Sequence, residues 1–146
     1  MGFIHDDDAV LREDGAFSLA AVDGVCHQQV MIADLKQEYF LAIVSNCQCG
    51  YIEAFLEHYG FGKYIADIQC FGMNEVPKGE NICLVVDRNR LEDAVYVGDI
   101  QGDYDASKAA GVRFVHAAYG FGEIADEVPW IECPSELKEV LRKIWS

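Results

Sequence analysis

The sequence predicts an α/β protein with a doubly wound, Rossmann-like parallel sheet and helices on both faces. From residue 26 onward, short apolar runs alternate with amphipathic segments of helical period. The 146 residues, 51% of them hydrophobic, suffice for one domain, and no repeat or Pro/Gly/Ser-rich linker divides them. Strands that alternate with helices of this length form parallel sheets, because each helix carries the chain back over one face. We therefore expect residues 1–146 to form a single domain.

The expected elements follow one another in a regular order. Helices are predicted where apolar residues recur every three or four positions, and strands where a short apolar run is continuous. The predicted helices cover residues 26–39, 50–62, 78–90, 105–111 and 135–145. The predicted strands cover residues 40–46, 65–72, 93–99 and 112–120. Ligands of such sheets bind beyond the carboxyl ends of the strands, so the residues there are the first candidates for a site.

Polar residues stand where two predicted strands end and where one helix begins. Ser45 and Asn46 end one strand, where a hydroxyl and the following amides can hold a phosphate or can simply cap a helix. Asp99 ends another strand and Asp103 follows four residues later, so the two carboxylates can converge on a divalent cation or can serve as helix caps. Lys78 opens a helix, where a cation opposes the helix dipole. It is either a surface lysine or a group that neutralises a phosphate.

Together, these residues resemble the haloacid dehalogenase (HAD) superfamily in their order and spacing. Ser45 in AIVSN is similar to its second motif, Lys78 in VPKGENI to its third, and YVGDIQGDYDASKAAGV to its fourth. The small residues of that last segment, and FVHAAYGFG after it, resemble the phosphoglycolate-phosphatase-like branch. The resemblance covers about residues 25–143. It implies a HAD core without a full cap domain.

The family's first motif, DxDx(T/V)(L/V), has one formal counterpart ahead of Ser45, which is Asp6-x-Asp8-x-Val10-Leu11. The residues that flank the two aspartates, His5, Asp7 and Ala9, are not of the types usual at these positions in the family. In one interpretation residues 2–5 are the central strand of the sheet, the two aspartates are the catalytic pair, and the residues up to position 24 form a flap. In the other, residues 1–24 are the remnant of a cap and the true first motif is missing.

The resemblance implies a Mg²⁺-dependent phosphatase that hydrolyses a small phosphorylated metabolite through an aspartyl-phosphate. In that reaction one aspartate attacks phosphorus and a second works as acid and base. The implied catalytic residues are Asp6, Asp8 and Lys78, the phosphate-binding residues Ser45, Asn46 and Lys78, and the metal ligands Asp6, Asp8, Asp99 and Asp103. The alternative is a catalytically impaired HAD-fold remnant or interaction domain that lacks the nucleophile. A dehalogenase, which uses the aspartate without Mg²⁺, is disfavoured by the intact GDxxxD.

Composition narrows the choice of partners. A net charge of −14 argues against general binding of nucleic acid or anionic membranes, since both require neutralising Lys and Arg. No signal peptide or membrane span is recognised, so we expect a cytoplasmic protein with six reduced cysteines, although Cys47-x-Cys49 could form a redox pair or half a metal site. The four histidines are interpreted as structural or surface residues. A homo-oligomer, in which a partner subunit covers the open site, is also compatible with the sequence.

Overall fold

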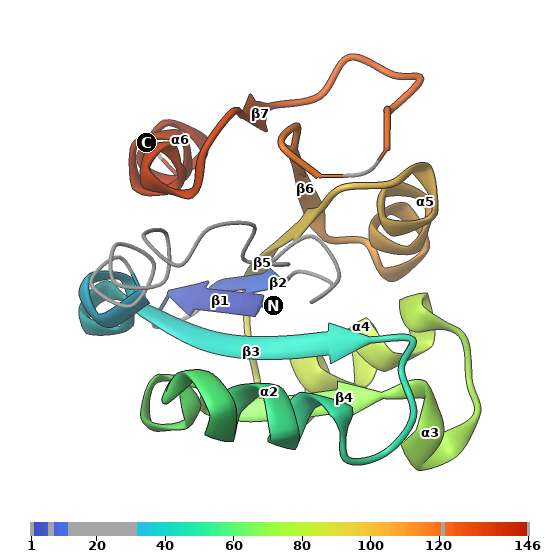
Figure 1. The fold of residues 1–146 in the computed structure, drawn as a ribbon. Helices are drawn as coiled ribbons and strands as arrows, with labels where there is room; N and C mark the ends of the chain where they lie inside the picture. The colour runs from blue at the N-terminus through green and yellow to red at the C-terminus, as the bar shows by residue number, and fades with distance from the viewer. Residues whose placement is uncertain (1, 6–7, 12–31, 121, 146) are drawn as a thin grey trace.

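The computed structural model describes residues 2–5, 8–11, 32–120 and 122–145, and within these a single sheet crosses the middle of the molecule (Figure 1). The strand order is β4-β3-β1-β2-β5-β6-β7. The strands are β1 (Gly2–His5), β2 (Asp8–Leu11), β3 (Tyr39–Ser45), β4 (Asp67–Cys70), β5 (Asp93–Gly98), β6 (Arg113–Ala117) and β7 (Trp130–Ile131). The helices are α2 (Tyr51–Tyr59), α3 (Phe71–Asn74), α4 (Lys78–Arg88), α5 (Gln101–Ala110) and α6 (Leu137–Ile144), and residues 32–38 are also helical.

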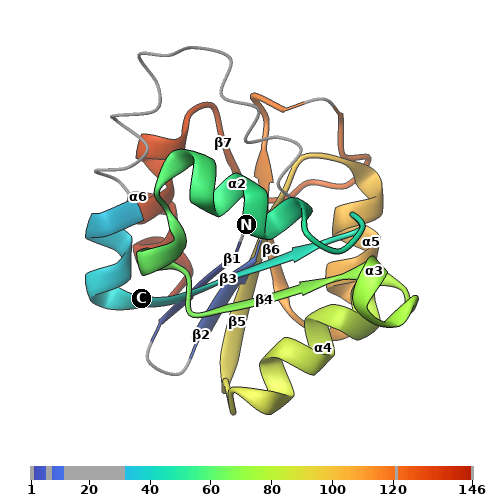
Figure 2. The same ribbon diagram turned by 60° about the horizontal axis from the view of Figure 1, so that its bottom comes forward.

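The sheet is parallel apart from β1, which confirms the predicted fold class. Strand β3 pairs in parallel with β4, β5 with β6, and β6 with β7, while β2 is parallel to both β3 and β5. Strands β3 and β5 therefore run in the same direction, and their carboxyl ends lie at the same edge of the sheet. Helices cover both faces, as Figure 2 shows, with α2 and α6 on one face and α4 and α5 on the other.

Strand β1 lies in the centre of the sheet but runs in the opposite direction to that predicted. It pairs antiparallel with β3, so that Ile4 lies opposite Phe40 and His5 opposite Tyr39. The end of β1 is consequently at the amino edge of the sheet. The interpretation of residues 2–5 as a central parallel strand that delivers its last residues to the carboxyl edge is therefore wrong. An apolar run predicts a strand, but it does not encode the direction in which that strand pairs.

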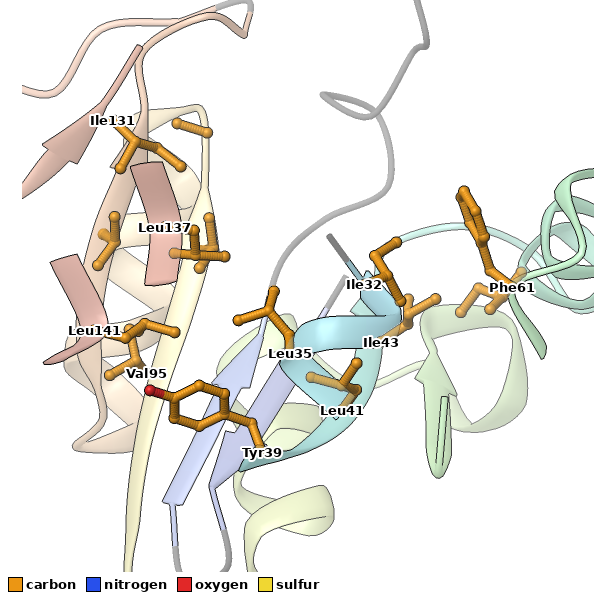
Figure 3. Close-up of a cluster of buried hydrophobic side chains, with 14 of the residues drawn as sticks. Ile32, Leu35, Tyr39, Leu41, Ile43, Phe61, Val95, Ile131, Leu137 and Leu141 are labelled. Carbon is orange, nitrogen blue, oxygen red and sulfur yellow. The ribbon is translucent and has the colours of Figure 1, made fainter. Parts of the chain in front are cut away.

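The strands divide the apolar side chains into two cores because successive residues point to opposite faces. From β3, Leu41 and Ile43 enter the first core, and Ala42 and Val44 enter the second. Figure 3 shows the first core, where side chains from the segment over residues 32–38, β3, β5, β7 and α6 meet. Each fully buried Leu or Ile contributes about 1.5–3 kcal/mol relative to exposure. These contacts hold the strand ends, and hence the site, in fixed positions.

One helix boundary follows the sequence pattern and another departs from it. Helix α2 ends at Tyr59, as the glycine at position 60 predicts, because Gly60 adopts φ 71° as its C-cap and donates its N–H to the Leu56 carbonyl. Helix α5 begins at Gln101, four residues before the predicted start, because the Asp103 side chain accepts the Ile100 N–H and caps the first turn. Helix α3 and strand β7 have only four and two residues, and the pattern did not predict either.

The described residues also bear on cysteine chemistry and membrane association. The five cysteines in the described ranges are all free, as expected for reduced thiols. None of the described helices has the length and apolar character that crossing a bilayer requires.

Candidate active site

The carboxyl ends of β3 and β5 meet at one edge of the sheet and carry two of the predicted site residues. Ser45 is the last residue of β3 and is 1% exposed, and its Oγ accepts the Cys47 N–H at 3.3 Å. Asp99 follows β5 directly and is 3% exposed. The buried Tyr96 hydroxyl donates to the Val44 carbonyl at 3.1 Å and so ties the two strands together just before they end. The structure thus brings Ser45 and Asp99 to the same edge.

Lys78 is a buried cation and not a surface lysine. It is the first residue of α4, follows Pro77, and is 6% exposed. Its Nζ lies 2.5 Å from Asp103 Oδ1 and 5.9 Å from the centre of the Tyr96 ring. A buried ammonium is tolerated only where a carboxylate and other polar groups compensate for its lost hydration. Of the two interpretations that the sequence allows for Lys78, the structure excludes an exposed surface lysine.

Asp103 connects Lys78 to the loop that carries Asp99. It is fully buried in the first turn of α5. While its Oδ1 faces Lys78, its Oδ2 accepts the N–H of Asp99 at 3.0 Å and that of Ile100 at 3.3 Å. One carboxylate therefore fixes both the cation and the backbone of the predicted metal ligand. This arrangement explains why two aspartates four residues apart stand after a buried strand.

Gly98 and Gly120 lack side chains where the Asp103 and Asp99 side chains lie, so the two aspartates fit against the backbone. A Cβ on Gly98 would lie 2.5 Å from Asp103 Cβ, and a Cβ on Gly120 would lie 2.3 Å from Asp99 Cβ and 2.7 Å from its Oδ2. Real Cβ atoms do not approach other atoms so closely, so any larger residue would displace the aspartates. The sequence pattern places Gly98 at the tip of a strand and does not indicate Tyr96 as a site residue. Both residues lie in β5, directly before Asp99, and this position in the sequence is the signal that could have identified them.

A groove of about 650 Å³ opens beside this cluster. Lys78 and Asn46 both line it, and most of its other lining residues are small or apolar. The remaining lining residues are Phe71, Pro77, Gly79, Glu80, Gly102, Ala106 and Ala109. Asn46 is exposed and adjoins Ser45, so it can reach a ligand held at the strand ends. The groove has the position and size to hold the organic part of a small ligand whose anionic end lies near Lys78.

The two predicted residues of the first motif are not brought to this edge within the described chain. Asp8 begins β2, where it lies opposite Asp93, the first residue of β5. Asp99 lies six residue positions after Asp93, and at about 3.3 Å per position this is a distance of about 20 Å along the chain. The strand register therefore contradicts the predicted place of Asp8 among the catalytic and metal-binding residues. Asp6 lies outside the described residues.

The oxygen ligands at this edge of the sheet are of the kind that binds Mg²⁺, but they are few, so a bound Mg²⁺ would need further ligands from water or from a phosphate. Asp99 supplies a carboxylate, the kind of ligand that Mg²⁺ prefers, whereas both oxygens of Asp103, the other predicted metal ligand of this loop, are engaged by Lys78 and by backbone N–H groups. No group of three or more His, Cys, Asp or Glu side chains that could hold a metal occurs within the described ranges. Mg²⁺ nevertheless needs few protein ligands, because it is usually held by one or two carboxylates together with waters and substrate phosphates. Asp99, with its backbone fixed by Asp103, can serve as such a ligand.

Comparisons with known proteins agree with the fold. The sequence model of the family described as haloacid dehalogenase-like hydrolase matches residues 17–117. A protein assigned as a phosphatase from Clostridium difficile is similar in structure, with TM-score 0.71 and 21% identity over 79% of this chain and 59% of its own. So is a predicted phosphoglycolate phosphatase from Haemophilus somnus, with TM-score 0.67 and 18% identity over 82% and 60% of the two chains.

A third similar structure is a haloacid dehalogenase-like family hydrolase from Streptococcus pneumoniae, with TM-score 0.69 and 21% identity over 77% of this chain and 57% of the other. The chain therefore spans about three fifths of the length of these proteins. Among curated proteins, no sequence matches it. At these identities the structural likeness establishes the fold, whereas the family model covers more than half of the chain. The chain belongs to the family of haloacid dehalogenase-like hydrolases.

Proposed function

We propose that the chain hydrolyses the phosphate monoester of a small metabolite in a Mg²⁺-dependent reaction. The observation that carries the proposal is the buried Lys78 ammonium, held 2.5 Å from Asp103 at the edge of the sheet where Ser45 ends β3 and Asp99 follows β5. Phosphoryl transfer depends mostly on positioning and on charge stabilisation. A fixed cation, a hydroxyl and a carboxylate able to bind a metal are the groups that such a reaction needs.

Each residue of the described site has a proposed role. The Ser45 hydroxyl and the Asn46 N–H donate to non-bridging oxygens of the phosphoryl group. Lys78 neutralises charge on the group as it is transferred, while Asp103 keeps the ammonium in place. Asp99 would hold Mg²⁺, which when bound draws negative charge from the phosphoryl oxygens. The organic part of the substrate lies in the groove beside Lys78.

The covalent step needs one further group. An aspartate carboxylate would attack phosphorus as the P–O bond to the alcohol breaks, and the leaving alkoxide would take a proton from solvent water; a second water would then hydrolyse the aspartyl-phosphate, which releases inorganic phosphate and restores the carboxylate. Asp6 is the nucleophile that the sequence pattern proposes. Asp8 receives no role here, because its register with Asp93 places it at the other end of β5.

A second candidate function is a domain that binds Mg²⁺ and phosphorylated ligands without turnover. The observation that favours it is the antiparallel direction of β1, which turns the end of that strand away from Ser45 and Asp99. This alternative retains the roles of Ser45, Lys78 and Asp99 in binding. It differs from the first in predicting no release of phosphate under any metal condition.

Release of phosphate from p-nitrophenyl phosphate, measured with and without Mg²⁺, separates the two functions. Hydrolysis by the wild type should require Mg²⁺, and Asp99→Asn should lower the rate by about 100-fold or more. Asp6→Asn tests whether Asp6 is the nucleophile, since its neighbour His5 lies at the opposite edge of the sheet from Asp99. Asp105→Asn is the matched control, because this aspartate lies on the same helix as Asp103 but is 60% exposed. Full activity in Asp99→Asn would refute the hydrolase site. Binding of phosphate without turnover by the wild type would favour the second function.

A further inference from the structure

His116 contacts the loop that carries Asp99, although its sequence context indicated only a structural or surface role. It lies on β6 opposite Gly98, the last residue of β5, and is half-buried. Its Nε2 is 3.2 Å from the Asp99 carbonyl oxygen and 3.3 Å from that of Gly122. Carbonyl oxygens can only accept hydrogen bonds, so Nε2 carries a proton and donates to both. A single N–H thus joins the loop after β5 to the loop after β6.

The loop after β6 forms a wall against Asp99. A Cβ on Gly120 would overlap the Asp99 side chain, and a Cβ on Gly122 would lie 2.9 Å from the Asp99 carbonyl oxygen and 2.9 Å from Ile100 Cγ2. The two backbones therefore approach each other as closely as glycine allows. If the His116 side chain were removed, the carbonyl oxygens of Asp99 and Gly122 would lose the N–H donor that they share. Removal of the donor is therefore expected to separate the loops.

Asp99 is consequently held from both sides of its peptide backbone. Its N–H donates to Asp103 Oδ2, and its carbonyl oxygen accepts from His116 Nε2. With both groups fixed, the carboxylate projects from a backbone that has little freedom to rotate. A metal ligand that is ordered before binding loses less conformational entropy when the metal arrives.

We propose that His116 is a positioning residue for the Mg²⁺ site, which acts by fixing the backbone of Asp99 and the wall formed by Gly120 and Gly122. This inference rests on the proposed function in one respect, namely that Asp99 holds the metal. His116 itself touches neither the substrate nor the reacting atoms in this assignment. Its contribution is to metal affinity and not to the binding of phosphate by Ser45 and Lys78.

Titration calorimetry with Mg²⁺ on the full chain tests the inference without any assay of activity. His116→Ala should weaken Mg²⁺ binding by about tenfold or more, the usual effect of losing a group that orients a ligand. His116→Gln, which retains an N–H donor at a similar reach, should recover most of that loss. His58→Ala is the control, because this histidine is exposed at the end of α2 and packs against Tyr59.

A second titration, with inorganic phosphate in the absence of metal, separates positioning from general damage. Wild type and His116→Ala, both shown to be folded by circular dichroism, should bind phosphate with affinities that agree within about twofold. Equal Mg²⁺ affinity in wild type and His116→Ala would overturn the inference while leaving the proposed function intact, and so would parallel losses of Mg²⁺ and phosphate binding. Absence of Mg²⁺ binding by the wild type, both with and without inorganic phosphate present, would overturn both.

Discussion

Breaking the buried pair between Lys78 and Asp103 gives the sharpest energetic test of the site. The perturbation is a double-mutant cycle made of Lys78→Met, Asp103→Asn and the combined variant. Methionine preserves the length and much of the apolar volume of the lysine side chain, and asparagine preserves the shape of the aspartate. The cycle therefore removes the two charges one at a time and then together.

The structure sets the expected magnitude. At 2.5 Å the pair has a gross attraction of about 7 kcal/mol for an effective dielectric constant of about 20. Desolvation offsets much of this, and removing one partner of a buried pair usually costs about 3–5 kcal/mol. The lower end applies to Lys78→Met, because Asp103 Oδ2 retains two N–H donors. Each single variant should lose about 3 kcal/mol, and the double variant about 3–4 kcal/mol instead of about 6.

Urea denaturation measures the free energy of unfolding for all four proteins. We expect a coupling energy of about 2–3 kcal/mol between the two positions. Lys138→Met provides the control, because Lys138 forms ion pairs with Asp34 and Glu38 nearer the surface, where such pairs contribute less than about 1 kcal/mol. Losses that add within about 0.5 kcal/mol would refute the reasoning that the charges are buried against each other.

Two further predictions concern the glycine wall and the stability at low pH. Gly120→Ala should displace Asp99, lower the free energy of unfolding by about 1–3 kcal/mol and weaken Mg²⁺ binding, whereas Gly102→Ala, whose Cβ would meet no atom closer than 3.7 Å, should do neither. A hydrogen bond from Lys138 lowers the pKa of Glu38 below 4.5. The stabilisation that the Glu38 carboxylate gives the folded state is therefore present above pH 4.5 and is lost as the pH falls through the lowered pKa. The difference in unfolding free energy between wild type and Glu38→Gln should therefore shrink in that acid range, and a constant difference would contradict it.

Much of the fold was predictable because its signals are local. Continuous apolar runs and helical periodicity predict most of the strands and helices between residues 32 and 145, and their alternation predicts a parallel sheet. The first part of the helix predicted over residues 26–39 lies outside the described residues. The places of Ser45, Lys78 and Asp99 follow from that pattern, since strand ends and helix starts meet at one edge. The burial of Lys78 was not predictable from its position alone. It depends on Asp103, which reaches across from another helix.

The first eleven residues show where the sequence pattern was insufficient. The residues around Asp8 fit the first motif by type, but type and spacing do not determine strand direction or register. The structure pairs β1 antiparallel with β3, and β2 places Asp8 opposite Asp93. The role proposed for His116 was likewise not predictable from the sequence, because it depends on two carbonyl groups from loops that come together only in the folded chain. Contacts of this kind are set by tertiary structure and not by periodicity.

The most direct test of a metal-dependent phosphoryl site is the affinity for inorganic phosphate with and without Mg²⁺, measured by calorimetry for wild type and Asp99→Asn. If Asp99 holds a cation that shares the phosphate with Ser45 and Lys78, Mg²⁺ should tighten phosphate binding by the wild type by about tenfold, a coupling of about 1.4 kcal/mol. Asp99→Asn should bind phosphate with the same affinity whether or not Mg²⁺ is present. Equal affinities of the wild type with and without Mg²⁺, or an equal gain in Asp99→Asn, would contradict the assignment.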